Sequence, residues 1–326
     1  MSRVFITGEK GFIAKNLRLA YEEAGHTVIS DDHLDNVQRI DTGEVCVHRN
    51  NEAVWENIFR SYEIDLVVHN AAVVGTDVVA LNPVESSSTN TVGTYNICRA
   101  AEKVNADVCY MGTSVIYDTP KYQDRKILED SDRGPRTLYG ALKLAGEHIV
   151  KTHCKRWTIM RPLFAYGGVG DMNSLIAKTF FAAKHDKDNI DMFLDPKLWK
   201  DYIHVSDFCN AVVIGSTSEQ GVNQDFNVSA QTPRSVGEIV NIMSEMLGSD
   251  ISTRIKWHPK TDYLGNHRLS SKKFRTLFGW SPKLSLEDGI SLAFREISEN
   301  RDSSYNPLKY LEDANEKDID LTQFYN

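Results

Sequence analysis

The sequence has few of the features that mark secreted, membrane-bound or nucleic-acid-binding proteins. Its five cysteines are odd in number and scattered, so they predict neither a disulfide framework nor a metal site, and they favour a reducing compartment. No stretch reaches the ~20 apolar residues of a membrane span, and the chain opens on a predicted strand without a signal-peptide pattern. The formal net charge of −8 is opposite to what a nucleic acid or an anionic membrane attracts. We therefore expect a cytoplasmic protein with a small-molecule partner and with no nucleic-acid or membrane partner.

Short apolar runs alternate with amphipathic segments through the first half of the chain. Of the 326 residues, 41% are hydrophobic, which is enough for a substantial core. The alternation predicts strand–helix–strand units, and hence an α/β fold with a doubly wound parallel sheet of six or seven strands. Strands are expected at residues 3–7, 27–30, 66–70, 107–111 and 158–160, with helices at 12–24, 55–62, 83–104 and 137–152.

A glycine-spaced loop follows the first predicted strand and opens the first predicted helix. Gly8 and Gly11 permit a tight turn and let the backbone approach a pyrophosphate, whose charge then meets the N–H groups of the helix start. The cofactor-binding residues expected here are Gly8, Lys10, Gly11, Phe12 and Ile13. Taken alone, such a loop also fits an ordinary strand-to-helix turn.

Two acidic residues, Asp31 and Asp32, end the second predicted strand, about 20 residues beyond this loop. A carboxylate there accepts hydrogen bonds from an adenosine ribose and repels the 2′-phosphate of NADP. The pattern favours NAD as the cofactor, while Arg39 and His33 nearby leave NADP open as the less favoured alternative. Both Asp residues also fit solvated turn positions.

Tyr139 and Lys143 lie four residues apart in a predicted helix and therefore project from one face. An adjacent ammonium and a nicotinium ring stabilise a phenolate, so a phenol with an ordinary pKa near ~10 becomes a usable proton acceptor. Thr113 follows the strand at 107–111, at the sheet edge where open α/β folds bind ligands, and is expected to hold a substrate hydroxyl against Tyr139. Without Thr113, the spacing fits a surface pair better than a catalytic one.

In this order the motifs resemble those of the extended short-chain dehydrogenase/reductase family, which includes NAD-dependent nucleotide-sugar epimerases, dehydratases and reductases. The resemblance reaches about residue 298 and rests also on residues 69–72, 90, 161–162, 166–167, 200–207 and 278–282. It implies that Thr113, Tyr139 and Lys143 are catalytic and that Asp32 binds the ribose. It also implies a homodimer built on the helices at 83–104 and 137–152. The further cofactor-binding residues expected from these motifs are Asn70, Ala71, Ala72, Asn90, Tyr139 and Lys143. Lys143 would hold the nicotinamide ribose in addition to tuning Tyr139.

The alternation of apolar runs and amphipathic segments ends after Pro162, where a Gly-rich, polar segment follows. We expect residues 1–163 to form a Rossmann domain that binds NAD, to which residues 200–230 return through a strand at 224–228. Residues 164–199 and 231–326 are expected to form a smaller C-terminal α/β substrate lobe and a tail. This lobe would contain helices at 235–247 and 285–297, each opened by a Ser able to cap it.

The residues that follow Thr113 reduce the number of reactions of this family that the chain is expected to catalyse. Ser114 and Val115 stand where dehydratases of the family carry an Asp–Glu pair, and Val115 stands where the GDP-fucose synthase branch carries a Cys. Two interpretations remain open: an NAD-dependent nucleotide-sugar 4-epimerase, which oxidises and re-reduces C4, and an NAD(P)H-dependent nucleotide-4-ketosugar reductase. The acidic end of the second strand favours the epimerase.

Residues expected to bind the nucleotide sugar are spread over several segments. They are Thr113, Ser114, Val115, Phe164, Asn173, Lys200, Tyr202 and Arg268. Phe164 replaces an Asn, and Lys200 an Arg, that relatives usually carry. Arg268 suits a bidentate contact with pyrophosphate, although a solvated surface Arg is an equal interpretation.

Two other function classes are disfavoured. An enzyme of hydroxysteroid-like or flavonoid-like substrates would line its pocket with apolar residues where this chain has Asn173, Lys200 and Arg268. A non-catalytic, redox-sensing module would have no chemical reason to keep Thr113 together with Tyr139 and Lys143.

Overall fold

The computed structural model describes residues 1–30, 51–171, 174–184, 190–258 and 264–299. Its centre is a six-stranded parallel sheet of order β10-β5-β4-β3-β1-β2. The strands are β1 (Arg3–Thr7), β2 (Thr27–Ser30), β3 (Leu66–His69), β4 (Asp107–Met111), β5 (Trp157–Pro162) and β10 (Gln224–Val228). The chain runs from β1 to β2 and then crosses to the other side of β1 for β3, so a topological switch point lies between β1 and β3. In open α/β sheets, ligands bind beyond the carboxyl ends of the strands at such a point.

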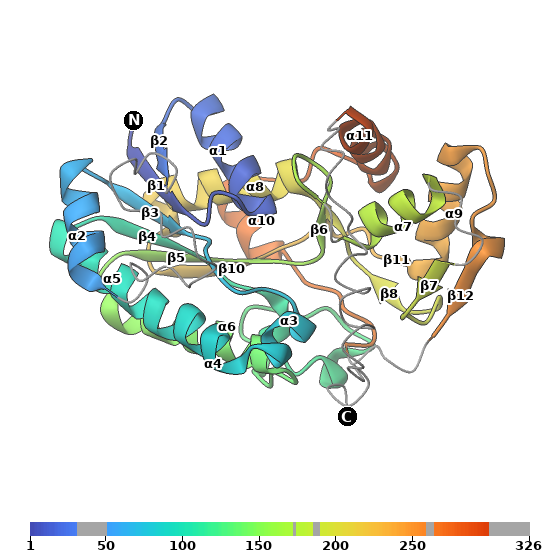
Figure 1. Ribbon diagram of the computed structural model, residues 1–326, viewed down its shortest axis with the longest axis horizontal. Helices are drawn as coiled ribbons and strands as arrows, with labels where there is room; N and C mark the ends of the chain where they lie inside the picture. Colours follow the sequence, from blue (N-terminus) through green and yellow to red (C-terminus); the bar gives the residue numbers. More distant parts are fainter. Residues whose placement is uncertain (31–50, 172–173, 185–189, 259–263, 300–326) are drawn as a thin grey trace.

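Helices cover both faces of this sheet (Figure 1). α1 (Phe12–Glu23), α8 (Val205–Thr217) and α10 (Lys272–Phe278) pack on one face, and α2 (Glu52–Ser61), α5 (Thr94–Val104) and α6 (Leu138–His153) on the other. Strand side chains alternate between the two layers, so Val4 and Ile6 join the first core and Phe5 joins the second. The predicted α/β fold with a doubly wound parallel sheet is confirmed.

The helix expected at residues 83–104 is continuous but changes its winding. α3 (Thr76–Leu81) precedes α4 (Pro83–Ser87), a π-helical segment η3 (Ser88–Gly93) and then α5. π-Helical turns inside α-helices often occur at functional sites, and Asn90 lies within this one. None of the helices in the described ranges has the length and apolar character needed to cross a bilayer.

A smaller group of elements lies beyond the carboxyl ends of the sheet strands (Figure 1). α7 (Leu175–Lys184), α9 (Val236–Leu247) and α11 (Leu286–Glu299) share a separate hydrophobic core. Three two-stranded ladders accompany them: β7 (Ile190–Met192) with β12 (Ile255–Trp257), β8 (Trp199–Lys200) with β11 (Arg234–Ser235), and β6 (Ala165–Tyr166) with β9 (Ile203–His204). The strand expected at 224–228 is β10, which pairs with β5 at the edge of the central sheet. The exact domain boundaries stay a prediction.

The two Ser residues expected to start helices do so. Ser235 Oγ accepts a hydrogen bond from the N–H of Glu238 at 3.2 Å, and the Glu238 carboxylate accepts one from the N–H of Ser235 at 2.7 Å. This capping box satisfies two amides that the helix itself leaves unpaired. Ser285 Oγ accepts from the N–H of Asp288 at 3.0 Å, at the start of α11.

Candidate active site

The loop between β1 and α1 has the geometry of a dinucleotide cradle. Gly8 adopts φ +74°, and a Cβ there would stand 2.9 Å from the Cα of Ala71. The N–H of Gly11 donates to the carbonyl of Gly8 at 2.9 Å and closes the turn. Gly11 then begins α1 without a side-chain cap, and the first turn contains no acidic residue. The first amides of α1 therefore suit a phosphate, so these residues fit a dinucleotide. Phe12 and Ile13 begin this helix and pack against its core, while Lys10 is exposed.

The segment after β3 is fixed against this loop by Thr7. Thr7 Oγ1 accepts hydrogen bonds from the N–H groups of Asn70 at 3.1 Å and Ala71 at 3.0 Å. It also lies 2.9 Å from Nδ1 of His69, whose other ring nitrogen lies 3.0 Å from Thr94 Oγ1. Asn70 and Ala71 therefore sit directly beside the Gly8 turn, with Ala72 next in the chain. His69 thus links the ends of β1 and β3 to the start of α5.

Asn90 supports the same segment from the π-helical turn. Its side-chain oxygen accepts from the N–H of Val73 at 2.8 Å, and its side-chain nitrogen donates to the carbonyl of Val73 at 2.9 Å. The predicted cofactor residues Gly8, Gly11, Asn70, Ala71 and Asn90 are thus brought together at one edge of the sheet. Asp31 and Asp32 lie outside the described residues.

Glu9 is a residue of the cofactor loop that the sequence reasoning missed. Its side chain is only 10% exposed, and its carboxylate accepts hydrogen bonds from Ser30 Oγ and from the guanidinium of Arg18. Ser30 ends β2, where the adenosine ribose lies in Rossmann folds. An acid in the middle of a glycine-spaced loop was the available signal, but only the tertiary contact shows where the carboxylate lies.

The start of α6 packs against the loop that carries Thr113. Thr113 follows β4, and its hydroxyl accepts from the N–H of Val115 at 3.5 Å, opening the short helix η4 (Ser114–Ile116). A Cβ on Gly140 would stand 2.7 Å from the carbonyl oxygen of Val115, so only glycine permits this approach. Tyr139, the neighbour of Gly140, is therefore held near the Thr113 loop, as the sequence predicts. Thr137 caps α6 by accepting from the N–H of Gly140 at 3.1 Å.

Lys143 lies one turn after Tyr139 and is almost completely buried, with 3% of its surface exposed. Its ammonium lies 4.2 Å from the centre of the Tyr110 ring. Burial lowers the pKa of Lys143 to about 7, and the charge of Glu147 opposes this shift. The ammonium and neutral forms are therefore close in energy at neutral pH.

Phe164, Lys200 and Tyr202, which the sequence predicts to bind the substrate, lie together in one cluster. Phe164 has φ +40°, an uncommon conformation for a bulky residue, and its ring lies 5.3 Å from the Tyr202 ring. The Lys200 ammonium lies 5.5 Å from the Phe164 ring centre and donates to the carbonyl of Gly265 at 2.7 Å. Strained backbone of this kind is concentrated at ligand sites.

His267 packs against Phe164 in the same cluster. It is fully buried, its ring lies edge-on to the Phe164 ring with the centroids 5.7 Å apart, and its backbone N–H donates to the carbonyl of Trp199 at 3.0 Å. Burial and the Lys200 charge lower the pKa of His267 to about 3. The imidazole is therefore neutral at physiological pH and is a poor proton acceptor.

Arg268, the residue after His267, contacts the backbone of Gln123. Its guanidinium donates to the carbonyl of Gln123 at 2.8 Å, in the loop after β4, while its buried Nε has no hydrogen-bond partner. Its contact with pyrophosphate stays a prediction. Asn173 lies outside the described residues.

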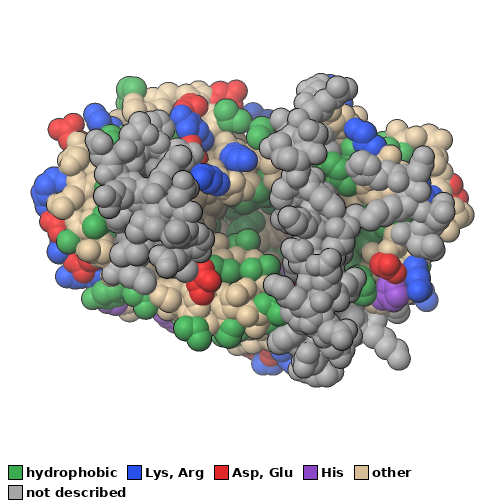
Figure 2. All heavy atoms as spheres, in the orientation of Figure 1, with side chains coloured by type: hydrophobic (Ala, Val, Ile, Leu, Met, Phe, Trp, Pro, Cys, Tyr) green, Lys and Arg blue, Asp and Glu red, His purple; other side chains and the backbone are tan. Residues whose placement is uncertain are grey.

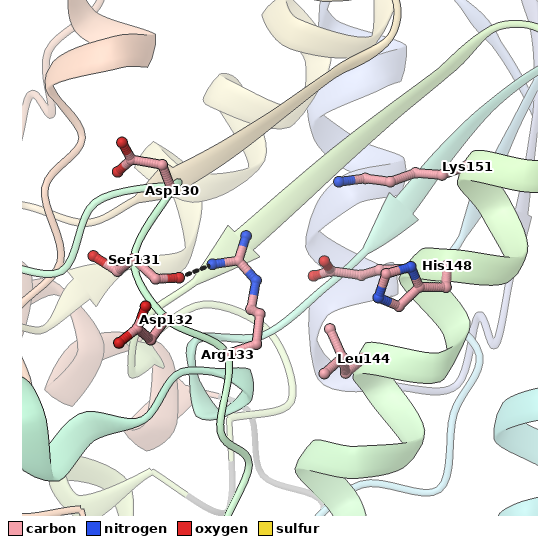
Figure 3. A pocket seen from close by; sticks show the side chains of 8 residues that line it. Asp130, Ser131, Asp132, Arg133, Leu144, His148 and Lys151 are labelled. Atoms are coloured by element: carbon pink, nitrogen blue, oxygen red, sulfur yellow. Dashed lines mark hydrogen bonds between the residues drawn. The ribbon is translucent and has the colours of Figure 1, made fainter.

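The face drawn in Figure 2 is hollowed between the sheet and the smaller lobe, with hydrophobic side chains in the hollow and Lys or Arg side chains at its edge. A second cavity, of about 360 Å³, lies beside the C-terminal half of α6 (Figure 3). Its lining residues are Asp130, Ser131, Asp132, Arg133, Leu144, Glu147, His148 and Lys151. Lys151 already pairs with Asp225 at 3.0 Å, and Arg133 donates to backbone carbonyls. None of the predicted site residues lines this cavity.

The family comparison agrees with this geometry. The NAD dependent epimerase/dehydratase family matches residues 4–229. Among curated proteins, UDP-glucuronic acid decarboxylase 1 of Danio rerio is 22% identical over 94% of this chain and 76% of its own length. UDP-glucose 4-epimerase of Halalkalibacterium halodurans is 26% identical over 89% of this chain and 94% of its own.

Solved structures share the fold. UDP-glucose 4-epimerase of Thermotoga maritima with UDP-glucose superposes with a TM-score of 0.77 at 22% identity, covering 91% of this chain and 99% of that one. dTDP-glucose 4,6-dehydratase of Bacillus anthracis in complex with NAD also gives 0.77, at 19% identity, covering 92% and 98%. With the family match spanning most of the chain, the protein belongs to the NAD dependent epimerase/dehydratase family of enzymes.

Proposed function

We propose that the protein is a nucleotide-sugar 4-epimerase that keeps NAD bound. The observation that carries this proposal is which residues follow Thr113 in the loop after β4. Ser114 and Val115 provide no carboxylate or thiol there, and the neighbouring His267 is held neutral by a pKa of about 3. Elimination of water needs a separate acid and base, whereas oxidation and reduction at one carbon need one proton-transfer group. Tyr139 alone fills that role.

The residue roles follow from chemistry at C4 of the sugar. Tyr139 accepts the proton of the C4 hydroxyl and later returns a proton to the same oxygen. The ammonium of Lys143, one turn away, favours the phenolate of Tyr139 by its charge. Thr113 holds the hydroxyl at the end of β4. NAD supplies the hydride acceptor and donor when it is bound.

The substrate class is inferred from two cationic side chains of the predicted substrate site and from the relatives. Lys200 offers a buried cation for a diphosphate, and Arg268 offers a second cation whose Nε is unpaired. The names of several relatives specify UDP-linked or dTDP-linked sugars. These observations support a nucleoside-diphosphate sugar without fixing its base.

The test begins with denaturing the purified protein and identifying any released nicotinamide by absorbance and mass. Stoichiometric NAD or NADH, followed by interconversion of a UDP-, GDP- or dTDP-sugar without added cofactor, is the expected result. An empty protein that binds NADPH more tightly than NADH would instead favour the NAD(P)H-dependent 4-ketosugar reductase.

We also propose a homodimer. Three apolar side chains on adjacent helices are open to solvent: Val92 at 46%, Tyr95 at 39% and Leu138 at 40% exposure. They lie on η3, α5 and α6, which pack beside one another. Burial of such a patch against a second copy removes apolar surface from water.

We also propose a cytoplasmic location. Cys98, Cys109, Cys154 and Cys209 are all free and buried, which suits a reducing compartment. Cys46 lies outside the described residues.

A further inference from the structure

The ammonium of Lys143 is buried beside an aromatic ring and not beside a carboxylate. Within the described ranges, no carboxylate lies at ion-pair distance from its Nζ. The nearest acid along α6, Glu147, is taken by Arg161, which donates to both of its carboxylate oxygens at 2.8 Å. Burial of an ammonium is costly, so a protein group that stabilises its charge, beside the ribose that Lys143 is expected to hold, affects its protonation.

The Tyr110 ring is that group. Tyr110 belongs to β4 and is 1% exposed, so no water competes for its ring face. The ammonium of Lys143 stands 4.2 Å from the ring centre, well within the range of a cation–π contact. A desolvated contact of this kind is stronger than an exposed one because the surrounding dielectric is low.

The backbone fixes the ring under the ammonium. A Cβ on Gly146 would collide with the Tyr110 hydroxyl, so the absence of a side chain at Gly146 lets α6 settle onto the ring. The ring also lies 5.7 Å from His69, which Thr7 and Thr94 hold in place. The position of the ring therefore depends on β3, β4 and α6 together.

We propose that Tyr110 is a positioning residue of the active site, whose ring face holds the Lys143 side chain and stabilises its ammonium form. This inference rests on the proposed role of Lys143 beside Tyr139. Its consequence is that Tyr110, which acts through Lys143, sets the fraction of enzyme in which Lys143 is charged. Loss of the ring face would shift a proton from Lys143 toward Tyr139 and lower the share of the active phenolate form.

The test compares Tyr110→Phe, which keeps a ring face, with Tyr110→Leu, which removes it. Lysine labelled with ¹³C at Cε is incorporated, the signal of Lys143 is assigned by its absence in Lys143→Met, and it is titrated by NMR. In the wild type and in Tyr110→Phe it is expected to titrate at the same pH. In Tyr110→Leu it should titrate about one pH unit lower. The kcat of Tyr110→Leu at pH 7 is expected to fall about tenfold below that of Tyr110→Phe, with little change in KM.

Thermal unfolding confirms that each variant is folded, and Tyr110→Met replaces the leucine variant if the latter does not fold. Equal titration of Lys143 in the wild type, the phenylalanine variant and the aliphatic variant would overturn the proposal. The titration needs no substrate, so failure of the epimerase assay is a separate result.

Discussion

Arg161 on β5 donates a hydrogen bond to each carboxylate oxygen of Glu147 on α6, both at 2.8 Å. Arg161 is fully buried and Glu147 is 2% exposed. Glu147 lies one turn beyond Lys143, so this pair fixes the helix that carries both predicted catalytic residues to the central sheet. Arg161 also bonds Asp225 of β10 and the hydroxyl of Tyr117.

Glu147→Gln is expected to destabilise the protein by about 3 kcal/mol, because breaking a buried ion pair leaves a buried charge short of a partner. Urea unfolding followed by circular dichroism measures the loss. Arg156→Gln is the matched control, since Arg156 pairs with Asp107 and Glu219 at the surface, where water replaces the contact. Equal losses in the two variants would contradict the structural role of the Arg161 pair.

Lys143→Met is expected to abolish turnover and yet to stabilise the fold near neutral pH by ~1–3 kcal/mol. Burial holds the pKa of Lys143 at about 7 in the folded state, well below its unfolded value. Between pH 7 and that higher value the unfolded wild type binds more protons, so wild-type stability rises with pH. The advantage of the methionine variant should therefore be largest at pH 7 and below, and should shrink as pH approaches 10.

The measurement is thermal unfolding of both proteins from pH 6 to pH 9.5. Lys155→Met serves as the control because the Lys155 side chain is 78% exposed. A stability difference that stays constant with pH would show that Lys143 is not strained by burial.

Glu9→Gln is expected to relax the preference for NAD over NADP by about tenfold in Kd ratio. The Glu9 carboxylate lies at the end of β2, bonded to Ser30, and its charge there would oppose the binding of a 2′-phosphate. Titration calorimetry with each dinucleotide measures the ratio. Glu22→Gln is the control, since Glu22 bonds the same Arg18 but lies on the outer part of α1. An unchanged ratio in Glu9→Gln would separate Glu9 from cofactor selection.

Tyr139→Phe should lower kcat by about 10²–10⁴-fold, because the phenol is the proposed proton-transfer group. Cofactor content, determined after denaturation, should stay the same as in the wild type. A folded Tyr139→Phe protein with full turnover would exclude this residue as the acid/base.

Tyr95→Asp is expected to convert the proposed dimer into a monomer at micromolar concentration, because a charge replaces an exposed apolar side chain of the proposed interface. Size-exclusion chromatography with light scattering reports the mass. Leu277→Asp introduces the same charge at a similarly exposed residue of α10, on the other side of the sheet, and should leave the mass unchanged. A wild type that is already monomeric would remove the dimer proposal.

Much of the fold could be predicted from the sequence because its signals are local. Alternating apolar runs fix strands and helices, and the spacing of Gly8 and Gly11 fixes the turn that begins α1. Tyr139 and Lys143 share a helix, so four residues of spacing are enough to place them one turn apart. The Ser residues that start α9 and α11 act on amides only three positions away.

The partners of these groups were decided only by the tertiary structure. Tyr110 lies 33 positions before Lys143, Glu9 meets Ser30 from another strand, and Arg161 reaches Glu147 from a strand beside the helix. Such contacts depend on the order of strands in the sheet and on how closely a helix packs against it. Gly140 and Gly146 permit the close packing of α6 because they have no side chain. The sequence thus determined which groups are predicted to carry the chemistry, whereas packing between distant segments decided the position and surroundings in which those groups are held.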